Sequence, residues 1–342
     1  MDELASLPMG RFLSLALLVI ALPAAAQSAV PAVHVEGNRF VDAAGETVVF
    51  RGVSIADPDK VEHEGQWNAA LFETLADWGA NVVRLPVHPR AWRQRGEAEY
   101  LELIDEAVAW AEAAGLYVMI DWHSIGNLRT EVFQHPMYET SKGETARFWR
   151  TVSARYAGTS TVAFYELFNE PTSYNGTLGR LSWHEHREMM ESLIGIVRAN
   201  DPDTIPLVGG LDWAYDLSGV REDPVRAEGI AYVTHPYPQK RERPWEPKWQ
   251  ETWGFVADRY PVFATELGFM SADGPGAHIP VISDESYGEA IVAFFEARGI
   301  SWAPWVFDPQ WSPQMIESWD FEPTAQGAFF RDAMRRLNAD GE

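Results

Sequence analysis

The sequence predicts a (β/α)8 TIM barrel preceded by a small N-terminal β-hairpin, built as one domain over residues 33–342. Eight short apolar segments that can form buried strands follow one another along the chain, and amphipathic helical patterns separate most of them. Residues 48–308 contain all eight segments, a span close to the roughly 250 residues typical of an eight-fold barrel. This alternation is the one expected of a parallel sheet closed by helices.

A doubly wound open sheet is the alternative for a chain in which strands and helices alternate. Such sheets commonly bind nucleotides through a glycine-rich turn after the first strand. The sequence contains neither a GxGxxG nor a GxxxxGK[ST] pattern, and it shows no linker or low-complexity tract. The barrel is therefore the favoured prediction.

The elements follow in chain order from their hydrophobic periodicity. Alternating segments at 33–41 and 47–55, joined by Asp42 and Gly45, predict the hairpin and then the first barrel strand. The other strands are expected at residues 81–87, 116–123, 162–171, 206–210, 230–237, 262–269 and 301–308. Helices are expected at residues 67–78, 99–114, 142–157, 182–200, 246–259, 285–298 and 324–338. A glycine directly follows each of the first three helices, as is typical of helix ends.

Residues 1–26 predict a signal peptide. An arginine precedes the apolar run 12–22, and residues 24–26 provide an A-x-A cleavage site. The run is about half as long as a membrane-spanning helix needs to be, and a short core helix is the alternative. Either Met1 or Met9 is the start of translation. We therefore expect a secreted or periplasmic protein, which must be stable without disulfides because the sequence has no cysteine.

The composition limits the partners of the protein. The chain carries 27 Lys and Arg against 50 Asp and Glu, a formal charge of −23, which repels nucleic acids and anionic membranes. Aromatic residues make up 13% of the chain and include 15 Trp, so a disordered acidic chain is excluded. We expect a monomer that needs no cofactor or metal. His184 and His186 resemble metal ligands only superficially, because no HExxH pattern accompanies them, and they are expected on a solvated helix start.

Polar and aromatic residues gather at the carboxyl ends of six predicted strands. They are Arg84, then Asp121, Trp122 and His123, then Asn169 and Glu170, then His235 and Tyr237, then Glu266, and finally Trp305. Taken singly, each has a structural explanation, such as a buried ion pair, a core ring or a helix cap. Packing alone gives no reason for these residues to favour one end of the strands. Because sites in parallel α/β folds lie at that end, we expect one shared site.

Glu170 and Glu266 are the centre of this predicted site. They end strands four and seven, which face each other across a barrel mouth. Two opposed carboxyl groups suit the cleavage of a glycosidic bond, in which one protonates the leaving oxygen and the other attacks the anomeric carbon or activates water. Tryptophan offers a flat face to a sugar ring, and Asn, His and Tyr can bind hydroxyl groups. An acidic chain favours a neutral polysaccharide or oligosaccharide as substrate.

These motifs together resemble glycoside hydrolase family 5, the cellulase-like barrels of clan A. The matching residues are LPV with Arg84, DWH at 121–123, FNEP at 168–171, HPY at 235–237, TELG at 265–268 and Trp305. The resemblance covers roughly residue 33 to the C-terminus. NEP alone is shared by related families, whereas HPY between NEP and TELG at these spacings makes the match specific.

The resemblance implies a retaining mechanism and a role for each site residue. Glu170 would be the acid/base, Glu266 the nucleophile and Asn169 the partner of the sugar 2-hydroxyl. Arg84 and Tyr237 would hold Glu266 ionised and aimed, His123 and His235 would line the same subsite, and Trp305 would form the platform beneath the sugar. We therefore expect the two carboxyl groups about 5 Å apart. Strict strand alternation would send Asn169 and Glu170 to opposite sides, so the chain should leave the regular pleat there.

Other residues give weaker signals. Candidates for outer sugar subsites are Trp92, Trp122, Trp213, Trp245 and Trp311, of which about half are expected to serve packing. Glu166 is expected to be a buried partner of Arg51 or Arg84 rather than a third catalytic group. The loops 123–143 and 238–250 do not indicate a substrate. Their basic residues Lys240, Arg241 and Arg243 are expected in solvent, with contact to the substrate as the alternative.

The predicted activity is that of a secreted retaining endo-β-glycosidase that hydrolyses β-1,4-glucan. β-Mannan, β-1,3-glucan and mixed-linkage glucan remain alternative substrates, because the matched residues surround the cleavage point and serve all of them. A sugar-binding barrel without catalysis and a metal-dependent hydrolase are alternatives from other classes. The presence of both glutamates argues against the former.

Overall fold

The computed structural model describes Met1 and residues 30–339, so the predicted signal peptide lies, apart from Met1, outside the described residues. Eight parallel strands form one sheet in the order β14-β13-β12-β11-β9-β6-β5-β4. They are β4 (Val53–Ser54), β5 (Val82–Val87), β6 (Tyr117–Trp122), β9 (Val162–Glu166), β11 (Ile205–Gly209), β12 (Ala231–Val233), β13 (Val262–Ala264) and β14 (Ser301–Trp302). Seven of them lie within a segment predicted as a strand, and β11 begins one residue before its predicted segment.

The sheet closes on itself between β4 and β14. Bridges join Arg51 to Trp302 and Ile55 to Phe307. The amide of Gly52 donates to the carbonyl of Trp302 at 3.0 Å. The predicted (β/α)8 barrel is therefore confirmed.

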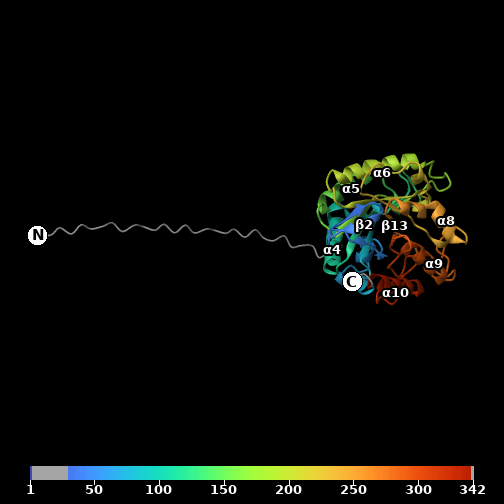
Figure 1. The fold of residues 1–342 in the computed structure, drawn as a ribbon. Coiled ribbons are helices and arrows are strands. Elements are labelled where there is room, and N and C mark those ends of the chain that lie inside the picture. The colour runs from blue at the N-terminus through green and yellow to red at the C-terminus, as the bar shows by residue number, and fades with distance from the viewer. Residues whose placement is uncertain (2–29, 340–342) are drawn as a thin grey trace.

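Helices surround the barrel (Figure 1). Those that the sequence predicts are α2 (Ala69–Asp77), α4 (Glu97–Ala113), α5 (Lys142–Tyr156), α6 (Trp183–Arg198), α8 (Trp245–Thr252), α9 (Glu285–Glu296) and α10 (Ala325–Ala339). The predicted helix 246–259 is divided into α8 and a 3-10 helix, η4 (Gly254–Asp258). A capping box between Ser182 and Glu185 fixes the start of α6. Among the described residues, none of the helices has both the length and the apolar content needed to cross a membrane.

Several short elements belong to the loops and were not predicted from the sequence. They are α1 (Pro58–His63), α3 (Pro89–Arg95), α7 (Leu211–Ala214), β7 (Ile125–Asn127), β8 (Val132–Phe133), β10 (Glu170–Pro171), η1 (Pro136–Tyr138), η2 (Ser218–Arg221) and η3 (Pro238–Lys240). Most of them follow the carboxyl end of a barrel strand. Their length is too small for a periodic pattern to show.

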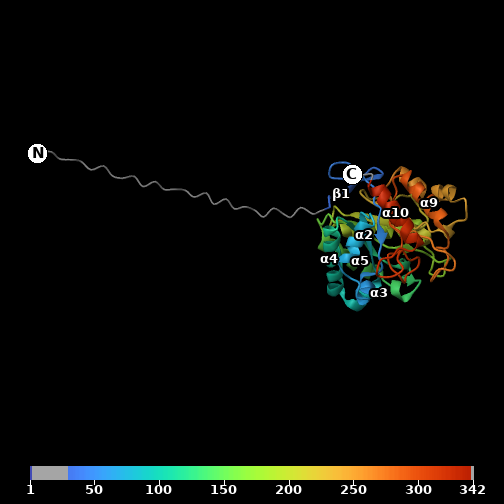
Figure 2. The ribbon, with the colours of Figure 1, turned by 90° about the horizontal axis from the view of Figure 1, so that it is seen from below.

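The predicted hairpin is confirmed and covers the amino-terminal end of the barrel. It consists of β1 (Val33–Glu36), β2 (Arg39–Asp42) and β3 (Thr47–Val48), paired in that order. The segment 47–55, predicted as one strand, is divided between the hairpin and β4. Phe40 of β2 packs against Phe50, Phe164 and Phe263, with ring centroids 5.4, 5.3 and 6.4 Å away. Figure 2 shows β1 at one end of the barrel and α3 at the other.

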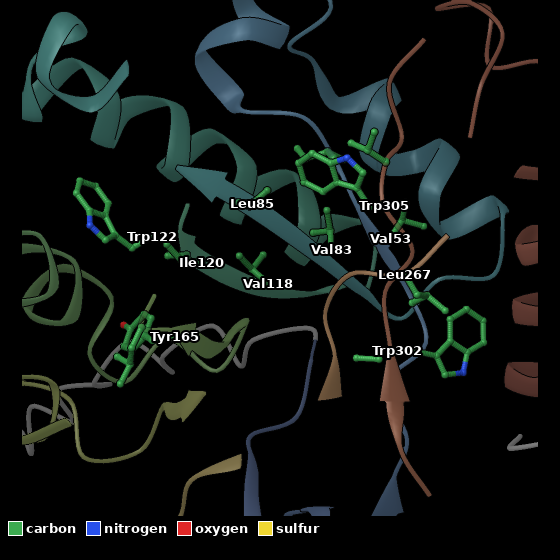
Figure 3. Close-up of a cluster of buried hydrophobic side chains, with 14 of the residues drawn as sticks. Val53, Val83, Leu85, Val118, Ile120, Trp122, Tyr165, Leu267, Trp302 and Trp305 are labelled. Atoms are coloured by element: carbon green, nitrogen blue, oxygen red, sulfur yellow. The ribbon is translucent and has the colours of Figure 1, made fainter. Parts of the chain in front are cut away.

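The outward faces of the strands form the larger apolar layer. Val83 and Leu85 of β5 and Val118 and Ile120 of β6 lie in a buried cluster with the helix side chains (Figure 3). Side chains alternate along a strand, so the residues between these point into the barrel. Arg84 is such a residue, and it is fully buried.

The inward faces change character along the strands. Phe164 of β9 belongs to the apolar cluster inside the barrel, and Glu166 lies two residues further on, on the same face. In the same way Phe263 of β13 precedes Thr265. Both Glu166 and Thr265 are fully buried. The barrel is therefore filled by aromatic rings at its amino-terminal end and by polar groups at its carboxyl end.

Candidate active site

Glu170 reaches the site because the chain leaves the pleat after Glu166. Strand β9 ends at that residue, and Glu170 and Pro171 form the separate strand β10, which pairs in parallel with β7. The amide of Glu170 donates to the carbonyl of Ser124 at 3.0 Å, and the amide of Asn169 donates to that of Trp122 at 3.2 Å. The predicted break in the strand is thus confirmed, and pairing with a neighbouring loop fixes Glu170.

The two glutamates line one cavity of about 640 Å³ at the carboxyl end of the barrel, together with His123, Tyr237 and Trp305. One carboxylate oxygen of Glu170, one of Glu266 and a ring nitrogen of His235 lie within 4.8 Å of one another. Glu170 is 8% exposed and Glu266 is 5% exposed, so both can meet a ligand while being largely shielded from water. The other predicted site residues, Arg84, Asn169 and His235, are fully buried next to them.

Glu266 is held by two hydrogen bonds. The Tyr237 hydroxyl donates to its Oε2 at 2.9 Å, and Arg84 Nη1 donates to its Oε1 at 3.1 Å. Arg84 also donates to Glu166 Oε2 at 2.6 Å and to Asn169 Oδ1 at 2.6 Å. Its Nη2 lies 3.0 Å from the carboxylate of Asp121. One guanidinium therefore serves three buried carboxylates.

The electrostatics of Glu266 differ from the sequence-based expectation. Burial raises the pKa of Glu266, and the charges of His235 and Arg84 oppose this rise without cancelling it. Arg84 thus favours the ionised form as expected, but burial outweighs it, so the net shift is opposite to the one expected. The physical reason is that Arg84 divides its charge among three carboxylates, while removal from water disfavours each of them.

Glu166 is the partner of Arg84, one of the two arginines proposed for it. Arg51 instead pairs with Glu296 at 2.6 Å. Although burial acts to raise it, the charge of Arg84 and contacts with His235 lower the pKa of Glu166 to about 2. Burial raises the pKa of Asp121 well above its ordinary value. Glu166 is thus the carboxylate that stays ionised under Arg84.

Two histidines flank the glutamates in different charge states. Nδ1 of His235 lies 3.0 Å from Glu170 Oε1, and the carboxylates around His235 raise its pKa to about 9 against the effect of burial. Nδ1 of His123 lies 2.6 Å from Asp121 Oδ2, but burial lowers the pKa of His123 well below its ordinary value. The His123 ring is parallel to that of Trp305, 5.2 Å away. His235 is therefore cationic near neutral pH and His123 is neutral.

Glu170, His235 and Glu266 are also the one group of described residues whose geometry could hold a metal ion. A cation there would have to compete with the guanidinium of Arg84, which already donates to Glu266. His184 and His186 lie elsewhere. His184 is exposed and faces Glu188 and Asp223, as expected of a solvated helix start.

The expectation of a solvated position is wrong for His186. This residue is 1% exposed, and its Nε2 lies 3.0 Å from the carbonyl oxygen of Gly209. Burial lowers its pKa to about 4. The helix α6 turns this position toward the barrel, which a count of polar residues in its first turn does not reveal.

Three of the five tryptophans proposed for outer subsites belong to the core. Trp92 packs on Phe148 at 4.9 Å, Trp122 donates to Thr145 among the helices, and Trp245 stacks on Trp249 at 5.8 Å. These side chains are 5%, 0% and 7% exposed, so the subsite proposal is wrong for them. Trp122 lies on the outward face of β6, like Val118 and Ile120, whereas Trp92 and Trp245 also contact the core rings of Tyr100 and Tyr287.

The other two tryptophans lie at the site. Trp213 lines the main cavity, and Trp311 stacks 5.9 Å from Trp305 beside a separate cavity of about 160 Å³. Trp213 is held in an unusual turn, because Asp212, Trp213 and Ala214 have φ of 57°, 58° and 56°. Such left-handed backbone in residues other than glycine is strained and clusters at functional sites.

Sequence reasoning missed the surroundings of Trp213. Tyr174 contacts its ring edge-on at 5.5 Å, Gln134 accepts from its Nε1 at 2.8 Å, and Lys240 Nζ lies 4.6 Å above it. Lys240 and Arg241 line the cavity, so for these two the geometry favours the alternative of substrate contact over a position on the solvated surface. Arg243 is 60% exposed and agrees with the expected position in solvent. The sequence did contain a signal for Lys240 and Arg241, because both follow HPY closely in a loop at a strand end.

Comparison with known proteins gives a family match. A family model described as cellulase, glycosyl hydrolase family 5, matches residues 41–310. Endoglucanase A of Butyrivibrio fibrisolvens is 28% identical over 71% of this chain and 53% of the relative. Endoglucanase E-5 of Thermobifida fusca is 27% identical over 80% of this chain and 55% of the relative. The chain thus spans about half the length of the curated relatives it matches.

Solved structures share the fold. A β-glucanase of Saccharophagus degradans in complex with cellotetraose has a TM-score of 0.90 and 49% identity, covering 94% of this chain and 98% of that one. The catalytic domain of Thermobifida fusca endoglucanase Cel5A has a TM-score of 0.71 at 23% identity, over 89% of this chain and 97% of that one.

Proposed function

The chain belongs to glycosyl hydrolase family 5, and from this premise we propose that it is a secreted retaining endo-β-glycosidase that hydrolyses β-1,4-glucan. The observation that carries the proposal is the pair Glu170 and Glu266, of which one carboxylate oxygen each lies within 4.8 Å of the other in one cavity lined by Trp305. The endoglucanase names of the relatives and the cellotetraose bound by the β-glucanase support a glucan substrate. The apolar run and cleavage site in residues 1–26 support export.

The retaining mechanism is supported by the short distance between one oxygen of Glu170 and one of Glu266. Retaining enzymes place the two groups about 5 Å apart, whereas inverting enzymes need roughly 6.5–9.5 Å to admit a water molecule between carboxylate and sugar. In the first step an oxygen of Glu266 bonds to the anomeric carbon while the glycosidic bond breaks and Glu170 protonates the leaving oxygen. In the second step Glu170 removes a proton from water, which displaces Glu266 from the sugar.

The supporting residues provide the contacts that this reaction needs. Arg84 and Tyr237 aim the oxygens of Glu266. Asn169 Oδ1 accepts from Arg84, and the buried Nδ2 of Asn169 has no hydrogen-bond partner among the described residues, so it is available to the sugar 2-hydroxyl. Trp305 offers a ring face at the cavity wall beside His123.

A product assay on four substrates tests this proposal. Cellulose derivative, barley β-glucan, mannan and laminarin are incubated in parallel, and the anomer formed first is identified by NMR. We expect hydrolysis of the β-1,4-glucans with retention of the β-anomer. Activity on mannan or laminarin alone would contradict β-1,4-glucan as the substrate, and release of the α-anomer would refute the retaining mechanism. Undiminished turnover after chelation is expected, because no step uses a metal ion.

A further inference from the structure

Beneath the two glutamates lies a third buried carboxylate that the proposed mechanism does not use. Glu166 is fully buried and receives Arg84 Nε at 2.6 Å on one oxygen and the Thr265 hydroxyl at 2.8 Å on the other. Oγ1 of Thr265 lies 2.9 Å from Nε2 of His235, and Nδ1 of His235 lies 3.0 Å from Glu170. A continuous chain of hydrogen bonds therefore connects Glu166 to the proposed acid/base.

The direction of each bond in this chain follows from the donors available. An ionised carboxylate can only accept, so Thr265 gives its single hydroxyl hydrogen to Glu166. The Thr265 oxygen can then only accept from His235, which means that Nε2 of His235 carries a hydrogen. Nδ1 is left to face Glu170 with one exchangeable proton between the two groups.

We propose that Glu166 and Thr265 are positioning residues that hold His235 with a hydrogen on Nε2; this inference rests on the proposed glycosidase function. Nδ1 of His235 and Glu170 then share the proton that is delivered to the leaving oxygen. As the glycosidic bond breaks, the shared proton passes through Glu170 to that oxygen, which leaves the imidazole neutral with its Nε2 hydrogen on Thr265. When Glu170 later takes a proton from water, the shared arrangement is restored. No other donor or acceptor is needed.

Charged and titratable groups surround His235 on several elements. They are Glu166 on β9, Glu170 on β10, Arg84 on β5, Asp121 and His123 at the end of β6, Tyr237 after β12, and Glu266 after β13. Two of the carboxylates, those of Glu166 and Glu266, lie 3.6 and 3.8 Å from the nearest His235 ring nitrogen. The pKa of His235, raised to about 9, agrees with a ring that retains its second proton beside these groups.

Two substitutions disturb the chain in different ways. In Glu166→Gln the amide oxygen must face the Arg84 donor, which turns the NH₂ group toward Thr265. The Thr265 hydroxyl is then forced to donate to His235, so the ring exchanges its hydrogen from Nε2 to Nδ1 and can no longer accept from Glu170. Thr265→Val keeps the shape of the side chain and removes the connection, whereas Thr265→Ser keeps the hydroxyl and should restore it.

The test measures kcat/KM against pH for a glucan oligosaccharide and for a dinitrophenyl β-cellobioside, whose leaving group needs no proton. For the oligosaccharide, Glu166→Gln and Thr265→Val should lower kcat/KM about tenfold or more and move the alkaline limb to lower pH. For the dinitrophenyl substrate the loss should be within about threefold. Thr265→Ser should behave like the wild type, and so should Glu296→Gln, which removes the same charge from the remote pair with Arg51.

Nitrogen-15 NMR of labelled histidine provides a readout independent of activity. The wild-type spectrum should show His235 with a hydrogen on Nε2 throughout the titration. Because this measurement uses the wild type, it tests the inference even if Glu166→Gln does not fold. Equal losses for both leaving groups, an unmoved alkaline limb, or a wild-type neutral ring with its hydrogen on Nδ1 would overturn the inference. A wild type inactive on every glycan would refute the proposed function instead, while the NMR result would still decide the arrangement of hydrogens.

Discussion

At the amino-terminal end of the barrel, Phe40 packs on Phe164 at 5.3 Å, and Phe50 packs on Phe164 at 4.8 Å. At the carboxyl end, Glu166 of the same strand meets the guanidinium of Arg84 at 2.6 Å. Both sets are fully or almost fully buried. Burying rings stabilises the fold at little electrostatic cost, whereas burying several carboxylates under one arginine opposes it.

This contrast assigns different tasks to the two ends of one sheet. Substitutions at the aromatic end should therefore change the stability of the fold and leave the activity nearly unchanged. The charged end should determine function and contribute less to stability, because active sites generally retain groups that folding alone would not favour. Four substitutions can sharpen or break the comparison, and they are given from the largest expected effect to the smallest.

Glu266→Ala should abolish hydrolysis, with a loss on the order of 10⁴-fold or more, because it removes the proposed nucleophile. The free energy of unfolding should stay unchanged or rise, since burial raises the pKa of Glu266 and thus disfavours its charged form. Activity assays and urea unfolding check both statements, with the exposed Glu246→Ala as control. Wild-type activity would refute the catalytic role, and a large loss of stability would break the contrast between the ends.

Phe164→Ala should do the opposite. It removes a fully buried ring that contacts Phe40, Phe50 and Phe263, and should lower the free energy of unfolding by about 3–5 kcal/mol. The kcat of the folded fraction should change less than about threefold, because no catalytic group moves. Phe164→Leu, which retains much of the volume, should lose about 1.5 kcal/mol or less. A selective loss of kcat at full stability would contradict the comparison.

Glu166→Gln should lower stability by about 2–3 kcal/mol near pH 6, where the lost carboxylate accepts charge-assisted hydrogen bonds. The pKa of Glu166 is lowered to about 2 from 4.5, so between these values the unfolded chain binds more protons than the folded one. The stabilisation by Glu166 is therefore present above about pH 4.5 and is lost as the pH falls toward 2. Urea unfolding of wild type and variant at pH 6, 4.5 and 3.5 should show converging stabilities. A constant difference would show that the charge is not its cause.

Trp213→Ala should raise KM for glucan oligosaccharides about tenfold, because it removes a ring that lines the cavity. Stability should change little, since this ring is only partly buried. Trp245→Ala is the matched control, because that ring is 7% exposed in the core and should lower stability while leaving KM unchanged. Reversed outcomes for the two variants would show that the placement of the aromatic residues is misread.

The site could be predicted from the sequence where the signal was local. The carboxyl ends of all strands of a parallel barrel meet at one face, so the sequence alone places Glu170, Glu266 and Trp305 together. The five candidate tryptophans carried no such mark. All lie near strand ends or in the following loops, and only the three-dimensional direction of each ring separates Trp213 and Trp311 from the three in the core.

The sequence by itself determined the barrel, the hairpin and the residues that meet at the carboxyl end of the barrel, because hydrophobic periodicity and strand ends are properties of neighbouring residues. Only the tertiary structure decided that the pKa of Glu266 is raised and that His186 is buried. It also decided that Glu166 is linked through Thr265 and His235 to Glu170. Charge states and hydrogen-bond chains depend on groups brought together from different strands, with Glu166 and Thr265 separated by 99 positions in the chain.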